Sequence, residues 1–247
     1  MTNTSDSRAK NVLVPDAFQT QNFATTAVVM LREMILTGGY GPGERLNELA
    51  ISEQLQISRS PIREALQALA GQGLVRFVPG RGAYVMEFDA HSVRDMGEVR
   101  IALETRAARL AADRATAQQL ATIEQMVLTE GSAIETGAIG EMLESSDVAI
   151  QSGAGYPAGI DFHHAVIEAS HNQRLTTVAD EVATQFRLAR ARTGREAAWA
   201  AAAHTEHVAI FDAIKAGDHD AASAAMELHL QNSTNAIIEH IEASGSR

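Results

Sequence analysis

The sequence contains no cysteine, and aromatic residues make up only 4% of its 247 positions. Without cysteine the chain can form neither disulfide bridges nor thiolate metal sites, which fits a reducing compartment. No run of apolar residues approaches the roughly 18 that a membrane-spanning helix needs, and the N-terminus lacks the pattern of a signal peptide. We therefore expect a cytoplasmic protein that is neither membrane-bound nor exported.

Acidic residues outnumber basic ones in this chain, except in its first third. The formal net charge is −11, which by itself argues against binding to nucleic acid. Residues 1–88, however, hold eight basic and eight acidic side chains, whereas residues 89–247 hold twelve basic and twenty-three acidic ones. Residues 57–82 contain four arginines and a single acid, Glu64. The acidity thus belongs to the second part of the chain, and a local basic patch remains in the first.

A short motif within this patch is typical of a DNA-recognition helix. The segment SRSPIREAL covers residues 58–66. Ser60 suits the cap position before a helix, and Pro61 suits the first helical position, where its missing N–H costs nothing. Arg59 and Arg63 then lie four residues apart, on one face at the start of the helix. That end of a helix can enter a major groove, where arginine binds guanine through two hydrogen bonds or contacts phosphate.

The flanking residues complete a winged helix-turn-helix. Residues 46–55 predict a short helix, and residues 56–58 form the turn that follows it. Residues 74–78 and 83–88 predict two strands, and the glycine-rich loop between them presents Arg81 at its tip. A winged helix that binds protein instead of DNA is the alternative, but the clustered arginines favour DNA.

Residues 23–88 resemble the winged helix-turn-helix domain of GntR-family bacterial transcription regulators, through PGERLNELAISEQLQISRSPIREALQALAGQGLVRFVPGRGAYV. The resemblance implies a homodimer that binds an inverted repeat in double-stranded DNA. The residues that it places at DNA are Arg59, Arg63 and Gly80, with Ser58 and Ser60 near phosphates. Many members also carry a DNA-contacting arginine directly after the position of Glu48. Here that residue is Leu49, so one expected contact is missing.

From residue 89 onward the pattern is helical. Apolar residues such as Val93, Met96 and Leu103 recur at helical spacing. Further helices are predicted at about 116–130, 160–170, 173–193, 195–216 and 219–243, and glycines between 131 and 159 indicate a break. We expect a mainly α protein with a mobile tail at 1–20, a winged helix-turn-helix domain at 21–88, and an all-α antiparallel bundle at 89–247 for effector binding and dimerisation.

Three histidines of the second part have the spacing of a metal site. His207 and His229 each lie eleven residues from Asp218, where the helix break is predicted. In an antiparallel hairpin both would lie at the same height, about 16 Å from the turn, and could share one ion. His163 on an earlier helix could supply a third nitrogen. Three imidazoles suit Zn, Ni or a similar divalent metal and leave positions open for a ligand.

Residues 89–247 resemble the FCD ligand-binding domain of the FadR subfamily of GntR regulators. The resemblance rests on residues 100–104, 162–175 and 206–230. It implies that the three histidines are metal ligands and that an aspartate ligand belongs at the position of Gly159. That aspartate is absent, so Asp161, water or the effector would complete the shell. Asp161 lies two residues further along the chain, which turns it about 200° from the ligand position on a helix.

The expected effector is a small organic acid. Open metal positions bind carboxylate and hydroxyl oxygens, and an arginine in the cavity would fix the negative charge. Arg100 is the first candidate because of its position in the family pattern, followed by Arg187 and Arg190. For these last two, a salt bridge on the helix surface is an equally good reading. We expect the effector to control operator affinity, most simply by relieving repression.

Two other functions remain open at this point. A metal-dependent enzyme could use a three-histidine site to activate water, but the sequence offers no well-placed general base and no HExxH pattern. The second alternative is a helical module that binds only proteins and has lost its ligand. The one feature that supports this alternative is Gly159. We therefore predict a regulator and not an enzyme.

Overall fold

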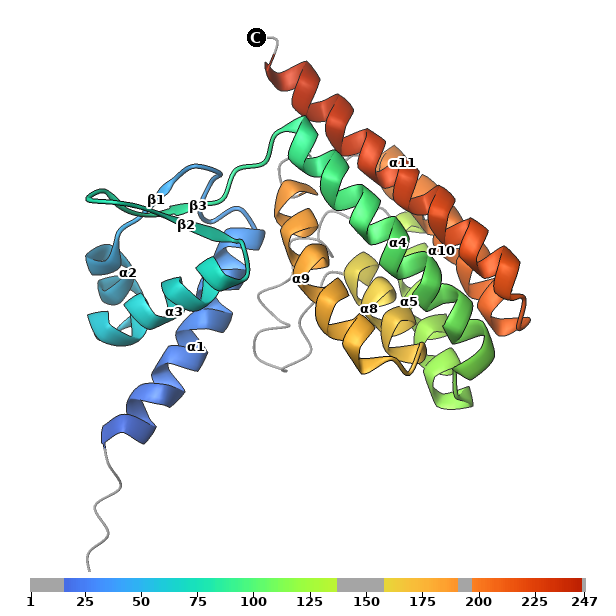
Figure 1. Cartoon of the computed structure of the whole chain (residues 1–247), viewed down its shortest axis with the longest axis horizontal. Helices are drawn as coiled ribbons and strands as arrows, with labels where there is room; N and C mark the ends of the chain where they lie inside the picture. Colours follow the sequence, from blue (N-terminus) through green and yellow to red (C-terminus); the bar gives the residue numbers. More distant parts are fainter. Residues whose placement is uncertain (1–15, 137–157, 191–196, 246–247) are drawn as a thin grey trace, which may run out of the picture.

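The computed structural model describes residues 16–136, 158–190 and 197–245, which form two domains (Figure 1). The first domain is a winged helix-turn-helix, and the second is a bundle of helices. The elements of the first domain are α1 (Asp16–Leu36), β1 (Arg45–Leu46), α2 (Glu48–Leu55), α3 (Arg59–Gly71), β2 (Val75–Val78) and β3 (Gly82–Val85). Helix α1 begins at Asp16, so it includes the end of the segment that we expected to be a tail.

The helix-turn-helix is held by a cap, a left-handed turn residue and an apolar core. Asn47 caps α2, because its side chain accepts hydrogen bonds from the backbone N–H groups of Leu49 and Ala50. Gln56 ends α2 with a φ of 54°, which turns the chain towards α3. The inner face of α3 buries Ile62, Leu66 and Leu69, which belong to one apolar cluster with Ala27, Leu31 and Ile35 of α1. This packing fixes the direction of α3.

The start of α3 differs from the sequence prediction. Ser58 is the cap residue, α3 begins at Arg59, and Pro61 is therefore in the third helical position. The prediction of Ser60 as the cap and Pro61 as the first residue was wrong. A proline is tolerated anywhere in the first turn, because those N–H groups have no partner within the helix. The hydroxyl of Ser60 instead donates to Glu64, at 3.3 Å.

A third strand joins the two of the wing. The strand order is β1-β3-β2, both pairs are antiparallel, and Arg45 and Leu46 lie opposite Tyr84 and Ala83. The sequence analysis missed β1, because a two-residue strand has no alternation to detect. Gly80 and Gly82 have φ values of 71° and 101°, which glycine adopts without strain in the hairpin loop.

The helical domain consists, in its described residues, of six helices (Figure 1). They are α4 (Ala90–Arg114), α5 (Ala117–Glu135), α8 (Ala158–Ala169), α9 (Gln173–Arg190), α10 (Ala197–Lys215) and α11 (His219–Gly245). The break between α10 and α11 is where the sequence predicts it, at Gly217, whose φ is 71°. Helix α5 continues through Gly131, so the predicted helix end at residue 130 was wrong. The glycine-rich segment 151–159 was expected to be a loop; residues 151–157 lie outside the described residues, and for residues 158 and 159 the prediction was wrong, because they are in α8. None of the described helices combines the length and the apolar character needed to cross a membrane.

The two domains meet where α9 contacts the end of α3. Phe186 and Leu188 of α9 are buried in the same apolar cluster as α1 and α3. Gln185 donates a hydrogen bond to the carbonyl of Gln72 at 3.4 Å, and Arg32 of α1 binds the side chain of the same glutamine. The chain just after the recognition helix is therefore bonded to both domains.

The packing of α4 against α11 yields a first prediction. A Cβ added at Gly97 would lie 2.6 Å from both Oγ1 and Cγ2 of Thr234, so no rotation of this short branched side chain relieves the clash. We expect Gly97→Ala to lower the free energy of unfolding by about 1–2 kcal/mol, because the overlap exceeds the gain in helix propensity. Urea denaturation measures the change. The Gly97→Ala/Thr234→Ala double variant should recover most of the loss, and Gly71→Ala, where the added Cβ meets nothing within 4 Å, should be neutral or stabilising. Equal stability of Gly97→Ala and wild type would contradict the close packing.

Candidate nucleic-acid interface and metal centre

The predicted DNA-reading residues lie together on the exposed face of the first domain. Arg59 and Arg63 stand at the start of α3, with side chains 58% and 56% exposed. Glu48 at the start of α2 binds both arginines: its carboxylate accepts from Nε and Nη2 of Arg63 at 3.1 and 2.7 Å, and lies 3.5 Å from Nη2 of Arg59. The hydrogen bonds from Arg63 lower the pKa of Glu48. The two guanidinium groups are thus fixed at the start of the recognition helix.

The other residues predicted to contact DNA are also exposed. Ser58 and Ser60 are exposed at the start of α3, and Gly80 and Arg81 are exposed at the tip of the wing. Leu49, at the position where the resemblance predicts an arginine, is 52% exposed. An exposed leucine one residue after Glu48 offers no charge to a phosphate, so this part of the surface differs chemically from the family pattern.

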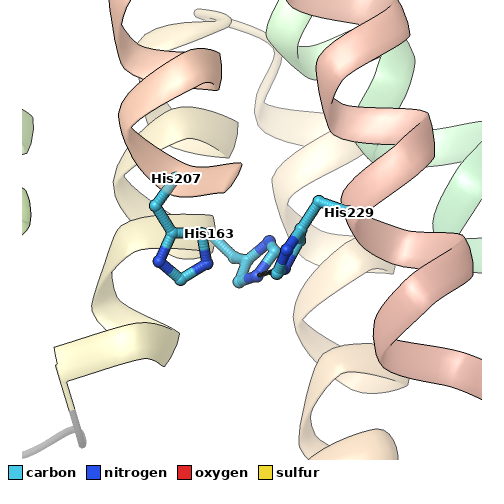
Figure 2. A group of neighbouring side chains, drawn as sticks. All are labelled: His163, His207 and His229. Atoms are coloured by element: carbon cyan, nitrogen blue, oxygen red, sulfur yellow. Dashed lines mark hydrogen bonds between the residues drawn. The ribbon is translucent and has the colours of Figure 1, made fainter. Parts of the chain in front are cut away.

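The three predicted histidines converge in the core of the helical domain (Figure 2). His163 comes from α8, His207 from α10 and His229 from α11, and all three are buried. One ring nitrogen of each lies within 4.8 Å of the others, and the Nε2 atoms of His163 and His229 are 3.1 Å apart. The structure therefore brings together the three histidines that the sequence analysis grouped.

A carboxylate from the protein binds Nδ1 of each histidine. Glu104 binds His163 at 2.7 Å, Glu130 binds His207 at 2.8 Å, and Glu206 binds His229 at 2.7 Å. The sequence analysis missed all three as partners. The motif of residues 100–104 contained a signal for Glu104, and Glu206 precedes His207 directly. Glu130 offered no signal, since α5 was expected to end there.

These carboxylates remain ionised. Burial raises the pKa of Glu104, but Arg100 and His163 outweigh it and hold the pKa at about 2. Burial of Glu130 is outweighed by His207 and His204, so its pKa is also lowered. The same holds for Glu206, where hydrogen bonds from His229 and Asn232 prevail. An ionised carboxylate can only accept, so each Nδ1 must carry the proton.

The Nε2 atoms of the three rings face one another. Burial lowers the pKa of His163 to about 4 and that of His229 to about 3, so both rings are neutral at pH 7. The Nε2 atom of His207 is buried and has no hydrogen-bond partner. A buried nitrogen with an unused lone pair is costly, and a metal ion satisfies it. The residues present thus fit a divalent metal with nitrogen ligands, oriented by carboxylates as metal-binding histidines commonly are.

The arginines predicted to bind an effector lie beside this centre. Arg100 is buried, donates to Glu104 at 2.7 Å, and stacks over Phe186 at 4.2 Å. Arg190 lies over Trp199 at 5.1 Å. A cavity of about 30 Å³ is lined by Arg100, Arg187, Arg190, Trp199, His163 and His229. A larger cavity of about 370 Å³ shares His163 and Arg187 with it and reaches Arg32 and Gln72 of the first domain.

Both domains of the chain match known protein families. Residues 23–85 match the model of the bacterial regulatory proteins of the gntR family, and residues 95–232 match that of the FCD domain. The HTH-type transcriptional regulator LutR of Bacillus subtilis is 33% identical, over 85% of this chain and 98% of that protein. The galactonate operon transcriptional repressor of Escherichia coli is 30% identical, over 89% of this chain and 99% of that protein. The Nta operon transcriptional regulator of Aminobacter aminovorans is 28% identical, over 85% and 92%.

The chain belongs to the GntR family of bacterial transcription regulators.

Two solved structures support the fold of this GntR regulator. Escherichia coli McbR/YncC superposes with a TM-score of 0.74 at 19% identity, over 88% of this chain and 97% of that one. A putative transcriptional regulator GntR from Rhodococcus sp. RHA1 superposes with a TM-score of 0.71 at 22% identity, over 88% of this chain and 98% of that one. The mainly α architecture with a small winged domain and an all-α bundle is therefore confirmed. The matches to the gntR and FCD families and to LutR confirm that the chain belongs to a family of regulators and not of enzymes.

The aspartate that the resemblance predicts as a further metal ligand is absent from this GntR regulator, which has Gly159 at that position. Gly159 and Asp161 both lie within α8, but their side-chain positions fall outside the described residues. Three further histidines contact polar side chains outside the cluster's Nε2 atoms. His164 binds Asp180 at 2.8 Å, His171 contacts Gln119 at 2.9 Å, and His204 lies 3.5 Å from the carboxylate that holds His207.

The buried pair of Arg100 and Glu104 yields a second prediction. Glu104→Gln keeps the size of the side chain but leaves the guanidinium of Arg100 buried without an opposite charge. We expect the free energy of unfolding to fall by about 3 kcal/mol. The wild type should also lose this contribution as the pH falls from about 4.5 towards 2, since its carboxylate pKa is depressed in the folded state. Guanidinium denaturation between pH 2 and 7 measures both effects.

The exposed pair of Arg109 and Asp220 provides the control. Asp220→Asn should change stability far less, because solvent screens this pair. Comparable losses in the two variants would show that the buried pair is worth no more than a surface one.

Proposed function

We propose that this regulator binds an inverted-repeat operator as a homodimer, and that a small carboxylic acid bound beside a divalent metal controls its operator affinity. The observation that carries the proposal is the convergence of three buried histidines, each bound at Nδ1 by a carboxylate, next to three arginines. Since its partner is DNA, we further propose that it acts in the cytoplasm.

At the DNA, the start of α3 would enter the major groove. Arg59 and Arg63 would read bases or contact phosphates there, with Ser58 and Ser60 near phosphates and the wing residues Gly80 and Arg81 at the adjacent backbone. A second copy would place the same face on the other half of the repeat. The neutral charge of residues 1–88 supports this, because the acidity of the chain lies in the other domain.

In the helical domain, His163, His207 and His229 would hold Zn, Ni or a similar divalent ion. The ion would offer open positions to carboxylate and hydroxyl oxygens. The chain's own groups orient the rings: Glu104, Glu130 and Glu206 fix each Nδ1, and this keeps each Nε2 directed inward. Water, Asp161 or the effector would complete the coordination.

The effector would be an organic acid of the hydroxy-acid or sugar-acid class. One relative is named for the galactonate operon, and galactonate carries both a carboxylate and hydroxyl groups. Arg100, Arg187 and Arg190 would bind the carboxylate. The 30 Å³ cavity between them is too small for such an acid unless side chains move, whereas the 370 Å³ cavity is of ligand size. A ligand that extends into the larger cavity would touch both domains, and this gives it a direct means of changing their relative placement.

The metal is tested by elemental analysis of protein purified without chelator or metal-affinity tag. We expect near-stoichiometric divalent metal in the wild type and a large loss in His207→Ala. A panel of hydroxy acids and sugar acids should raise the melting temperature of the wild type and not that of the variant. His91→Ala is the matched control, because His91 is exposed on α4 and pairs only with Asp95 among the described residues. Equal metal content in wild type and His207→Ala, or no metal in either, would refute the metal centre and leave an effector held by arginine alone.

The DNA interface is tested with a duplex enriched by the wild type from a random library. Arg63→Ala should weaken binding to this duplex about 10- to 100-fold, because a bidentate base contact is lost, while the melting temperature is unchanged. Arg94→Ala removes the same charge from an exposed site on α4 and should bind normally. Unchanged affinity of Arg63→Ala, measured by fluorescence anisotropy, would remove α3 from the interface.

A further inference from the structure

Glu48 lies between the two arginines at the start of the recognition helix. It accepts two hydrogen bonds from Arg63 and lies within 3.5 Å of Arg59. Its side chain is only 23% exposed, whereas the arginine side chains are more than half exposed. The carboxylate is therefore at the base of the cluster, and the guanidinium groups extend from it towards solvent.

This contact divides the guanidinium of Arg63 into two edges. Nε and Nη2 form the side edge, which Glu48 occupies. The end edge, formed by Nη1 and Nη2, keeps N–H groups that point away from Glu48. Two such N–H groups are what O6 and N7 of a guanine accept from arginine in the major groove. Arg63 can therefore bind Glu48 and a guanine at the same time.

The charge of Glu48 has a second effect. Arginines attract the phosphates of any sequence, and this attraction gives non-specific binding. A carboxylate in contact with both arginines cancels part of their charge, and an arginine that swings out to a phosphate must leave it. Binding to unrelated DNA is thus weakened, while a guanine contact that leaves the pair intact is not. Holding the side chain in advance also reduces the entropy lost on binding.

We propose that Glu48 is a positioning residue that determines base specificity: it directs the end edge of Arg63 to a guanine and weakens binding to unrelated sequences. The proposal rests on placing Arg63 at DNA, as the proposed function does.

The test compares wild type, Glu48→Gln, Arg63→Ala and the double variant. Each is titrated with the enriched duplex, with versions in which single guanines are replaced by adenine, and with a scrambled duplex, over a range of salt. Glu48→Gln should bind scrambled DNA more tightly, with a slope of log affinity against log salt steeper by about one. Its preference for guanine at one position of each half-site should fall about tenfold. In the Arg63→Ala background the same change should alter that preference no further.

A matched control and the melting temperatures separate this role from helix stabilisation. Glu53→Gln removes the same charge from an exposed position of α2 and should keep the guanine preference. The proposal fails if Glu48→Gln keeps the wild-type preference, or if its affinities for enriched and scrambled DNA fall by one common factor. If Arg63→Ala also keeps the preference, the DNA interface itself is misplaced. If Arg63→Ala loses it and Glu48→Gln does not, only the role of Glu48 is wrong.

Discussion

The helical domain depends on the pairing of three buried histidines with carboxylates, of which Glu104 and Glu130 are buried and Glu206 is partly exposed. Glu104 joins α4 to α8 through His163, Glu130 joins α5 to α10 through His207, and Glu206 joins α10 to α11 through His229. Groups of this kind are costly to bury unless each finds its partner, so the helices cannot shift past one another without losing several contacts together. The same bonds set the tautomer of every ring. One set of interactions therefore fixes both the packing of the bundle and the direction of the three nitrogen lone pairs.

Helix α9 connects this centre to the DNA-binding domain through three consecutive residues. Phe186 stacks on Arg100, Arg187 lines both cavities, and Gln185 donates to the carbonyl of Gln72, just after α3. The side chain of Gln185 packs closely against the backbone of Gly73. An added Cβ at Gly73 would overlap this side chain, and the φ of Gly73 is 71°. A change in the position of α9 therefore acts on the end of the recognition helix directly, without an intervening loop. Coupling between the two sites needs such a shared element that both of them contact.

The sequence predicted those features that depend on local patterns and failed where distant residues meet. The fold class, the recognition helix and the positions of His207 and His229 follow from periodicity and from the break at Gly217. The cap at Ser60 was wrong because Pro61 is compatible with any position of the first turn, and the pattern alone could not select one. The helix end at residue 130 was wrong because Gly131 is tolerated inside α5, against His204. The partners Glu48 and Glu130 lie 15 and 77 residues from the side chains they bind, so no spacing rule could reveal them.

The balance of charge around the three rings shows why a divalent ion suits this core. Burial keeps His163 and His229 neutral at pH 7, and three ionised carboxylates contact the three rings. Arg100 is the one permanently charged cation, among the described side chains, that bonds directly to any of these carboxylates. The three carboxylates thus outnumber the permanent cations bonded to them by two, in surroundings that stabilise isolated charge poorly. A divalent cation at the Nε2 atoms would neutralise this excess through the rings. Arg187 and Arg190 border the cavity beside these rings, so an anionic ligand there would lie next to a core whose excess negative charge the ion had already offset.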